Sequence, residues 1–282
     1  MKVSVILPTY NEADNIVPLI TAILANIPAR YEAEIVVVDD NSPDGTARGV
    51  ADHFGGDRRV ITINRTSEPG LAKSIRAGLE RATGDALIVM DTDFTHDPVE
   101  IPRLLHVGEV YDLVSGSRFC PGGTMQDTRH YLTSLVYNWM LRVMLRTQVQ
   151  DNLGGYFVIS RKTLRELPFD LIFYGYGDYF FRLLFFVQRN QGRVVEIPAQ
   201  YRGRTAGVSK SRVLNMIVKY SWGAIQLRIA AWRAASDPRL LGRYASRHER
   251  ATDGLPFDGA GAGPRRGHDP ENPAQRAHGE TR

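Results

Sequence analysis

The sequence predicts an α/β protein with a single, mostly parallel sheet flanked by helices. Short apolar runs alternate with segments of helical periodicity through the first third of the chain. The runs cover 3–7, 35–38, 60–64 and 86–90, and the helical segments cover 11–26, 46–54 and 70–82. Because the runs are almost entirely apolar, we expect strands that helices bury on both faces, as in parallel sheets.

The boundaries of these first elements follow from individual residues. Pro8 interrupts the first apolar run, so we expect the first strand to stop there. The segment 11–26 places Ile16, Ile20 and Ile23 on one helical face. Each apolar run is short and rich in β-branched residues, which favours a buried strand over a helix.

The second half of the chain predicts longer helices between fewer strands. Strands are expected at 113–115, 157–160 and 194–197, and helices at 128–146, 180–187 and 212–235. From about Ser236 the composition changes to Arg, Gly, Pro, Asp and His, and large apolar residues almost disappear. We therefore expect one domain over 1–235 and a disordered tail over 236–282.

Composition and charge exclude several classes of protein. With 282 residues and 43% hydrophobic content, the chain can bury one substantial core. The net charge of +4 suits a phosphate-bearing ligand but is too mild and scattered to favour nucleic acid. Cys120 is the only cysteine, so a reducing compartment is favoured. With no secretory signal and no apolar stretch of about 18 residues, we expect a cytoplasmic protein without a membrane span.

Polar residues follow three of the predicted strands at the point where each strand ends. The clusters are Pro8-Thr9-Tyr10-Asn11-Glu12, Asp39-Asp40-Asn41 and Asp91-Thr92-Asp93. Ligands of open α/β sheets bind outside the carboxyl ends of the strands, so we expect the three clusters to form one site.

The third cluster predicts a divalent cation. Asp91 and Asp93 stand two residues apart on a turn, so both carboxylates can face one Mg²⁺ or Mn²⁺. Such a metal would neutralise a diphosphate leaving group. A lone Asp-x-Asp is commonly a cap or a turn, and Asp39-Asp40 alone could cap the next helix. Three clusters at neighbouring strand ends favour a nucleotide-diphosphate site instead.

Basic residues in the second half supply candidate phosphate contacts. Arg118 follows the strand at 113–115, Arg129 begins the next helix, and Arg204 and Lys210 bracket a loop. Guanidinium forks suit phosphate oxygens, and lysine supplies a point charge. Taken singly, each of these side chains also fits a solvated surface charge.

Other catalytic systems lack their sequence signatures. The chain has no Gly-x-x-x-x-Gly-Lys loop, and no Gly-x-Gly-x-x-Gly follows the first strand, which disfavours NTPases and dinucleotide enzymes. The histidines show no zinc spacing, and no Gly-x-Ser-x-Gly elbow is present. His96 lies close to the acidic pair, and we expect it to start a helix rather than bind the metal.

These segments together resemble the family-2 glycosyltransferases, and within them the polyprenol (dolichol) phosphate mannosyltransferases. The matching segments are 3–12, 36–46, 82–85, 90–93 and 116–119, the last followed by Gly122-Gly123. The similarity runs from residue 1 to about 225 and is most specific in the first hundred residues.

The resemblance implies a GT-A fold, in which one Rossmann-like sheet binds the donor nucleotide. It implies that Arg118 and Arg129 meet the phosphates of donor or acceptor, and that the loop with Arg204 and Lys210 closes over the diphosphate. The donor contacts that it implies are Pro8, Tyr10, Glu12, Val38, Asp40, Asp91, Thr92, Asp93 and Thr95.

The sequence departs from the family pattern at two positions. The carboxylate that is familiar before the Glu-x-Pro strand is not aligned here, and Asp178 is the candidate substitute. Thr95 stands where a longer amide is often found. Both positions bear on the identity of the donor sugar. Many relatives also carry carboxyl-terminal membrane spans, which this sequence lacks.

We expect transfer of a sugar, with mannose from GDP-mannose leading, to a polyprenyl (dolichyl) monophosphate with inversion. The acceptor phosphate is already anionic, so alignment and charge stabilisation replace a strong base. One alternative is a family-2 enzyme that uses a UDP-sugar or a saccharide hydroxyl, for which Asp178 is the first candidate base. Another is a nucleotide-sugar-binding protein without turnover.

A lipid acceptor requires contact with a bilayer. The helices at 128–146 and 212–235 each combine an apolar stripe with Arg or Lys, as interfacial helices do. The same stripes also suit packing on the sheet or on each other. We expect peripheral attachment at the cytoplasmic face of a membrane, with a small membrane anchor protein as a further means.

Overall fold

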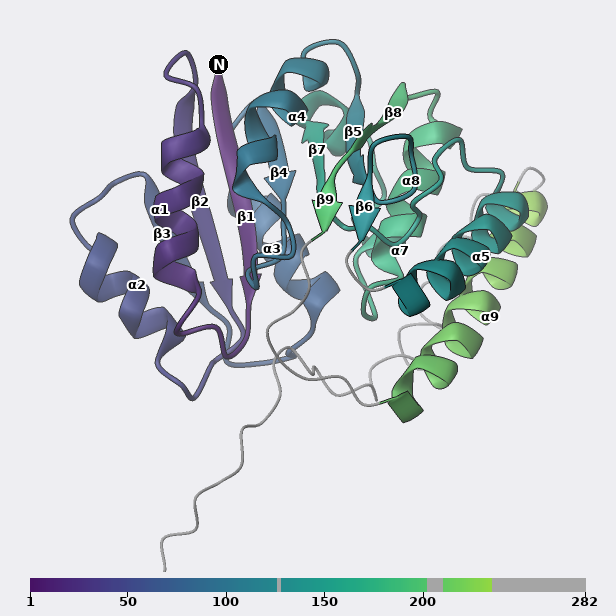
Figure 1. Cartoon of the computed structure of the whole chain (residues 1–282), viewed down its shortest axis with the longest axis horizontal. Helices are drawn as coiled ribbons and strands as arrows, with labels where there is room; N and C mark the ends of the chain where they lie inside the picture. The colour runs from purple at the N-terminus through teal and green to yellow at the C-terminus, as the bar shows by residue number, and fades with distance from the viewer. Residues whose placement is uncertain (126–127, 202–209, 235–282) are drawn as a thin grey trace, which may run out of the picture.

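The computed structural model describes residues 1–125, 128–201 and 210–234, and it describes side chains for 1–124, 131–201 and 217–232. Seven strands form one sheet in the order β3-β2-β1-β4-β7-β5-β8 (Figure 1). Only β7 runs antiparallel to its neighbours, β4 and β5, within this described sheet. The strands are β1 (Lys2–Thr9), β2 (Glu32–Asp39), β3 (Val60–Asn64), β4 (Ala86–Val89), β5 (Leu113–Ser117), β7 (Phe157–Ser160) and β8 (Val194–Pro198).

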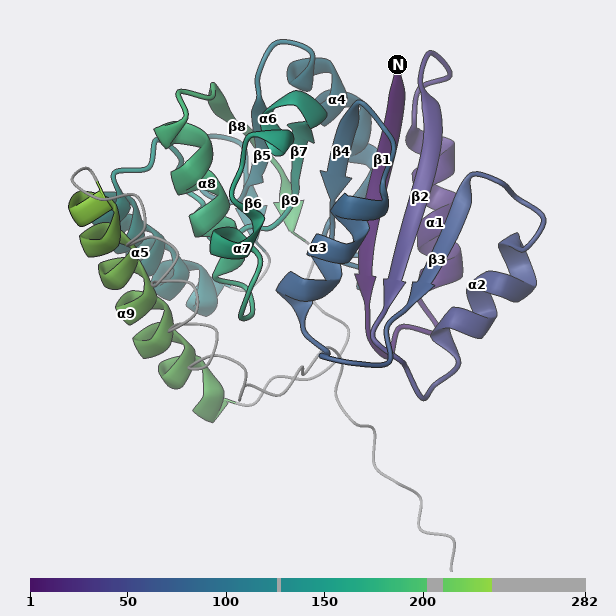
Figure 2. The ribbon, with the colours of Figure 1, turned by 180° about the vertical axis from the view of Figure 1, so that it is seen from behind.

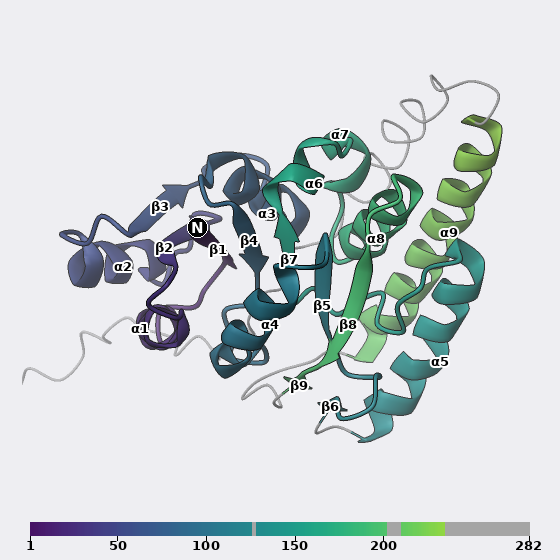
Figure 3. The same cartoon turned by 90° about the horizontal axis from the view of Figure 1, so that it is seen from above.

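Helices cover both faces of the sheet. One face carries α1 (Ile16–Asn26), α2 (Thr46–Phe54), the 3₁₀ turn η1 (Pro98–Glu100) and α4 (Ile101–Gly108). The other carries α3 (Leu71–Arg81), α6 (Arg161–Arg165), α7 (Phe169–Ile172) and α8 (Tyr179–Arg189). Beyond β8, α5 (Thr128–Leu145) and α9 (Lys210–Ala234) lie side by side (Figures 1 and 3). A two-stranded parallel sheet pairs β6 (Thr124–Met125) with β9 (Gln200–Tyr201).

The core consists of two apolar clusters, one on each face of the sheet. On β1, Val5 and Leu7 pack with α1 and α4, whereas Ile6 packs with α3 on the opposite face. Seen from behind, α3 lies across the parallel strands (Figure 2). Burial of alternate side chains on opposite faces explains why these strands carry almost no polar residues. The expected mostly parallel sheet covered on both faces is confirmed.

We expected the first strand to stop at Pro8, but it does not. Instead β1 continues to Thr9, and Pro8 pairs in register with Val38 of β2. The carbonyl of Thr9 accepts a hydrogen bond from Asp40 on the β2 side, so Pro8 faces the β4 side. There β4 has already ended at Val89, opposite Ile6, so no partner on β4 requires the N–H that proline lacks.

Several other boundaries differ from the sequence prediction. The helix expected at 11–26 begins only at Ile16, because Asn11 has a positive φ of 58° and the residues after it form a turn. The elements α6, α7, β6 and β9 were missed because each is too brief for a periodic pattern, and α4 was missed although Ile101, Leu104 and Leu105 have helical spacing. The tail expected at 236–282 lies outside the described residues.

Candidate functional site

The structure brings the three predicted polar clusters together at the carboxyl edge of β1, β2 and β4. Backbone N–H groups of the first cluster donate to side chains after β2, Asn11 to Ser42 at 3.0 Å and Glu12 to Thr46 at 3.0 Å. The Thr92 hydroxyl lies 3.4 Å from the carbonyl of Pro8, which ties the third cluster to the first. Figure 1 shows these strand ends pointing to the same side of the molecule.

Asp40 lies at the centre of this edge, with a fully buried carboxylate. Its Oδ1 accepts a hydrogen bond from Arg65 at 2.6 Å, and its Oδ2 accepts one from the N–H of Gly70 at 2.8 Å. The Arg65 guanidinium also donates to the carbonyl of Glu68 and the hydroxyl of Ser74. Asp40 therefore holds the loop that leads into α3. Sequence analysis missed Arg65, although an arginine directly after a strand was a usable signal.

The other residues expected to contact the sugar-nucleotide donor near β1 and β2 differ in burial and in hydrogen bonding. Val38 points into the core, so only its backbone faces this edge, where its carbonyl lies 3.4 Å from the Thr9 hydroxyl. Glu12 accepts a hydrogen bond from the Asn15 amide at 2.7 Å. Tyr10 is half-buried beside them. Their contacts with a donor remain predictions.

The acidic pair lies on a turn directly after β4. Asp93 accepts hydrogen bonds from the N–H and hydroxyl of Thr95, at 3.1 and 2.5 Å. The Asp91 N–H donates to Nδ1 of His96 at 2.8 Å, and the Asp91 side chain remains 42% exposed. Phe94 directly follows the pair and has a positive φ of 60°. A cation approaching from solvent can therefore reach the Asp91 carboxylate.

Both carboxylates of the turn act on the buried ring of His96. Burial lowers the pKa of His96 overall, while the charges of Asp91 and Asp93 act in the opposite direction. The ring is therefore neutral near pH 7, which leaves Nδ1 free to accept the Asp91 N–H. We expected His96 to start a helix, and it does not. It lies one residue before Asp97, whose side chain caps η1.

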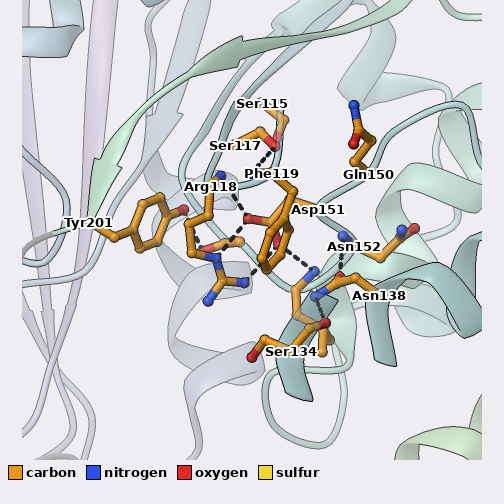
Figure 4. A network of polar contacts seen from close by, with 12 residues as sticks. Ser115, Ser117, Arg118, Phe119, Ser134, Asn138, Gln150, Asp151, Asn152 and Tyr201 are labelled. Carbon is orange, nitrogen blue, oxygen red and sulfur yellow. Dashed lines mark hydrogen bonds and ion pairs between the residues drawn. The ribbon is translucent and has the colours of Figure 1, made fainter. Parts of the chain in front are cut away.

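Arg118 supplies the cationic side of the site. It follows β5, and its guanidinium donates two parallel hydrogen bonds to the Asp151 carboxylate, from Nε at 2.8 Å and from Nη2 at 2.7 Å. Figure 4 shows the guanidinium between this carboxylate and the Tyr201 ring, whose centroid is 5.0 Å away. Burial alone lowers the pKa of Arg118, but Asp151 outweighs it and raises that pKa, so the guanidinium stays charged.

The pair leaves part of the guanidinium for a ligand. Nη1 of Arg118 takes no part in the contact with Asp151, and the side chain is 12% exposed, whereas Asp151 is fully buried. The charge of Asp91 also acts on Arg118, which places the two groups within electrostatic reach. An anion at this edge would therefore meet a guanidinium of fixed orientation.

The loop before β7 positions Asp151, a residue that the sequence analysis did not identify. Glu196 of β8 accepts hydrogen bonds from the N–H groups of Gln150 and Asp151, at 2.7 and 2.8 Å. The N–H of Asn152 donates to Asn138 of α5 at 2.7 Å. These polar partners are far apart along the chain, and only the run Gln150-Asp151-Asn152 gave a local signal.

Asp178 lies elsewhere, in a buried ion pair at the start of α8. Its carboxylate accepts from Nη1 of Arg182 and, at 3.0 Å, from the N–H of Tyr176. The Arg182 guanidinium packs 3.7 Å from the centroid of the Tyr174 ring. Asp178 is 1% exposed and Arg182 is fully buried, so the pair is part of the core. The surroundings of Asp178 do not support its candidate role as a base.

Three candidate phosphate contacts have no described side chain. Arg129 belongs to the first turn of α5 and Lys210 is the first residue of α9, but only their backbone is described. Arg204 lies outside the described residues. Their roles remain predictions.

A mostly parallel sheet with an acidic turn and a fixed arginine at its carboxyl edge defines an α/β protein whose candidate site lies where ligands of such sheets bind. The family model of glycosyl transferase family 2 matches residues 4–168. The chain therefore belongs to glycosyl transferase family 2, as the sequence resemblance indicated.

Similar proteins of known role come from bacteria and an archaeon. An undecaprenyl-phosphate mannosyltransferase of Micrococcus luteus is 36% identical over 217 residues, which are 74% of this chain and 87% of that protein. A polyprenol monophosphomannose synthase of Mycolicibacterium smegmatis is 36% identical over 75% of this chain and 82% of its own length. A dolichol-phosphate mannosyltransferase of Pyrococcus furiosus is 33% identical over 74% of this chain, which spans 59% of that longer protein.

Solved structures share the fold. Glucosyl-3-phosphoglycerate synthase from Mycobacterium tuberculosis, in complex with Mn²⁺, UDP and phosphoglyceric acid, aligns with a TM-score of 0.63 and 21% identity. The alignment covers 80% of this chain and 78% of that one. The same enzyme with Mg²⁺ and UDP aligns with a TM-score of 0.59. This likeness confirms the expected GT-A fold.

Proposed function

We propose that this glycosyltransferase moves mannose from GDP-mannose to a polyprenyl monophosphate, with inversion at the anomeric carbon. The observation that carries the proposal is the position of the Asp91 turn and the Arg118–Asp151 pair at one edge of the sheet. An acidic turn suits the metal-bound diphosphate of a donor, and a fixed guanidinium suits an acceptor phosphate. The relatives named for polyprenol- and dolichol-phosphate mannosyl transfer support this choice of acceptor and sugar.

The chemistry of the acidic turn fits Mg²⁺ or Mn²⁺. Asp91 and Asp93 offer the carboxylate oxygens that these cations prefer. Within the described side chains, no group of three or more His, Cys, Asp or Glu residues is placed to hold a metal. The two aspartates would therefore share the ion with the donor phosphates, which is usual for Mg²⁺. When bound, the metal stabilises the charge of the leaving diphosphate.

The acceptor phosphate carries its own nucleophile. A monophosphate ester is anionic near pH 7, so one of its oxygens can attack the anomeric carbon without a base. The Nη1 side of Arg118 would orient that oxygen, while Asp151 keeps the guanidinium in place. The burial of Asp178 in its pair with Arg182 supports this acceptor over a hydroxyl, which needs a base.

An exposed apolar surface supports contact with a bilayer. We call it the α5–α9 apolar face, and its side chains are between 36% and 77% exposed. Nine of the thirteen exposed large hydrophobic residues in the described side chains belong to it. They are Leu132, Val136, Trp139 and Val143 of α5, and Val218, Trp222, Ile225, Ile229 and Trp232 of α9.

The opposite sides of these helices pack in the core, so one helix face serves core packing while the other remains exposed. Leu141 and Leu145 of α5, and Tyr220 and Leu227 of α9, are buried. Groups of exposed apolar side chains mark interaction surfaces, and tryptophan favours the lipid–water interface. No helix in the described parts of the chain is long and apolar enough to cross a membrane. We propose peripheral attachment through the α5–α9 apolar face, with a small membrane anchor protein as an additional partner.

A donor panel tests the proposed function. The purified chain is incubated with radiolabelled GDP-mannose or UDP-sugars and polyprenyl phosphate, with Mg²⁺ or Mn²⁺ and with or without EDTA. We expect label in the lipid fraction from GDP-mannose, lost with EDTA. Lipid label from a UDP-sugar alone would replace the donor, and label that survives EDTA would remove the metal from the proposal.

A further inference from the structure

Aromatic rings connect the acidic turn to the arginine of the site. His96 is 1% exposed, and its ring stacks on Tyr156 at a centroid distance of 4.8 Å. The Tyr201 ring meets the His96 ring edge-on, also at 4.8 Å. Tyr201 in turn lies 5.0 Å from the guanidinium carbon of Arg118. Packed side chains therefore run from the acidic turn to Arg118.

Hydrogen bonds fix both ends of this series of contacts. At one end, Nδ1 of His96 accepts from the N–H of Asp91 at 2.8 Å. At the other end, the Tyr201 hydroxyl donates to the carbonyl of Gly154 at 3.0 Å and lies 3.4 Å from that of Gly116, just before Arg118. The backbones of His96 and Tyr201 also form an isolated antiparallel bridge.

The second nitrogen of His96 indicates that packing alone does not explain this residue. Nε2 is buried and makes no hydrogen bond of good geometry among the described residues, although the Gly154 carbonyl lies near enough to act on the ring. Nε2 lies 3.7 Å from Oδ2 of Asp91, which is beyond hydrogen-bonding distance. A buried donor without a well-placed partner destabilises a fold, so stability alone would favour an apolar residue here.

We propose that His96 and Tyr201 are positioning residues that hold the Asp91 turn at a fixed distance from Arg118. The inference rests on the proposed function, in which the turn serves the donor diphosphate and Arg118 the acceptor phosphate. Neither His96 nor Tyr201 needs to touch a substrate. Their effect is on alignment, where a displacement of about 1 Å costs about 100-fold in rate.

Two substitutions of His96 separate alignment from folding. His96→Leu fills the space but removes the acceptor for the Asp91 N–H, whereas His96→Asn keeps an acceptor near the position of Nδ1. We expect His96→Leu to lower kcat about 30-fold with KM values changed less than about threefold, and His96→Asn to recover much of the loss. Equal kcat values for the two variants, or a loss of thermal stability with kcat unchanged, would overturn the proposal.

A double-variant cycle tests whether the two residues act as one unit. Tyr201→Leu should lower kcat about as much as His96→Leu, and the double variant should lose little more than either single one. Tyr201→Phe keeps the ring contacts but removes the hydroxyl that donates to the Gly154 carbonyl, so we expect a loss in kcat smaller than that of Tyr201→Leu. Losses in kcat that multiply in the double variant would show independent roles and contradict the proposal.

The measurements separate this inference from the proposed function. The kcat values are taken with whichever acceptor of a panel, lipid phosphate or saccharide, the unsubstituted enzyme uses. No transfer to polyprenyl phosphate would disprove the proposed acceptor, yet coupled losses with a saccharide would still support the positioning role. Transfer to polyprenyl phosphate, together with losses in kcat that multiply in the double variant, would support the proposed acceptor and disprove the positioning role.

Discussion

The two edges of the central sheet both carry buried polar clusters, and they differ in how completely the clusters are satisfied. At the amino edge, the Glu34 carboxylate accepts hydrogen bonds from Ser4 and from both donors of Thr83, and it pairs with Lys2 at 2.9 Å. At the carboxyl edge, Asp91 is 42% exposed. There His96 Nε2 is buried and makes no hydrogen bond of good geometry among the described residues.

This difference indicates that the amino edge contributes mainly to stability and the carboxyl edge mainly to function. A fully satisfied buried cluster stabilises the fold, and it leaves no group for a ligand. At the carboxyl edge, the buried Nε2 of His96 costs stability, and the Asp91 carboxylate is exposed where a ligand can reach it. We therefore expect substitutions at the carboxyl edge to lower activity and substitutions at the amino edge to lower stability.

The largest expected effect is at the acidic turn. Asp93→Ala should reduce transfer by about 1000-fold or more, because the donor diphosphate loses a metal ligand. Initial rates with saturating Mg²⁺ measure the loss, and circular dichroism measures the fold. The exposed Asp14, beside the same edge, is the matched control, and Asp14→Ala should stay within about twofold. An active Asp93→Ala enzyme would refute the metal role.

Asp151→Asn should affect both properties, because this residue belongs to the site and to the core. The change leaves the buried Arg118 without its charged partner, so we expect kcat to fall about 100-fold and the unfolding free energy by about 3 kcal/mol. Denaturant unfolding and initial rates measure the two losses. Asp112, which pairs with the more exposed Arg193, is the control: Asp112→Asn should cost below about 1 kcal/mol and leave kcat unchanged. Equal losses in the two variants would contradict a special role for Asp151.

The contribution of Glu34 to stability should depend on pH, which tests the role of the amino edge. Burial alone raises the pKa of Glu34, but hydrogen bonds from Ser4, Thr83 and Lys2 outweigh it and lower the pKa from 4.5 to about 2. A lowered folded-state pKa contributes stability above pH 4.5 that disappears as pH falls toward 2. Glu34→Gln should therefore cost about 3 kcal/mol at pH 7, and the deficit should shrink between pH 4.5 and 2. A deficit independent of pH, or a lower kcat at pH 7, would contradict this assignment.

The smallest expected effect is on membrane binding. Replacing Trp139 and Trp222 by serine should weaken binding to lipid vesicles about tenfold, because two large side chains leave the α5–α9 apolar face. Cosedimentation with vesicles measures the change. Val99 and Val110 are also exposed but lie outside this face, so their replacement by serine is the control. Equal losses for both pairs would argue against the α5–α9 apolar face.

The first half of the chain was readable from sequence because its signals are local. The strands that lead to Tyr10, Asp40 and Asp91 are continuous apolar runs, and each polar cluster follows its strand directly. The rule for ligand binding at the carboxyl edge of α/β sheets then placed the clusters together. The error at Pro8 arose because β4 ends early, a fact about pairing that β1 itself does not contain.

The second half was less readable because contacts between distant residues assemble it. Arg118 depends on Asp151, which Glu196 orients, and no periodic pattern connects these positions. Sequence offered Asp178 as a candidate base, and it could not indicate the buried pair with Arg182, because a buried arginine is not recognisable before the fold is known. Charge pairs in a core follow from packing, whereas turn residues after strands follow from local order.

One comparison tests most directly whether the acceptor is a phosphate held by the carboxyl edge. The enzyme is given GDP-mannose, Mg²⁺ and either a polyprenyl phosphate or the same polyprenol without its phosphate, and label in the lipid fraction is counted. We predict transfer to the phosphate alone, because the site offers an oriented guanidinium, and because Asp178, the candidate base for a hydroxyl, is buried in its pair with Arg182. Equal transfer to the free alcohol, or label appearing only in added saccharide, would contradict the assignment of Arg118 and Asp151 to an acceptor phosphate.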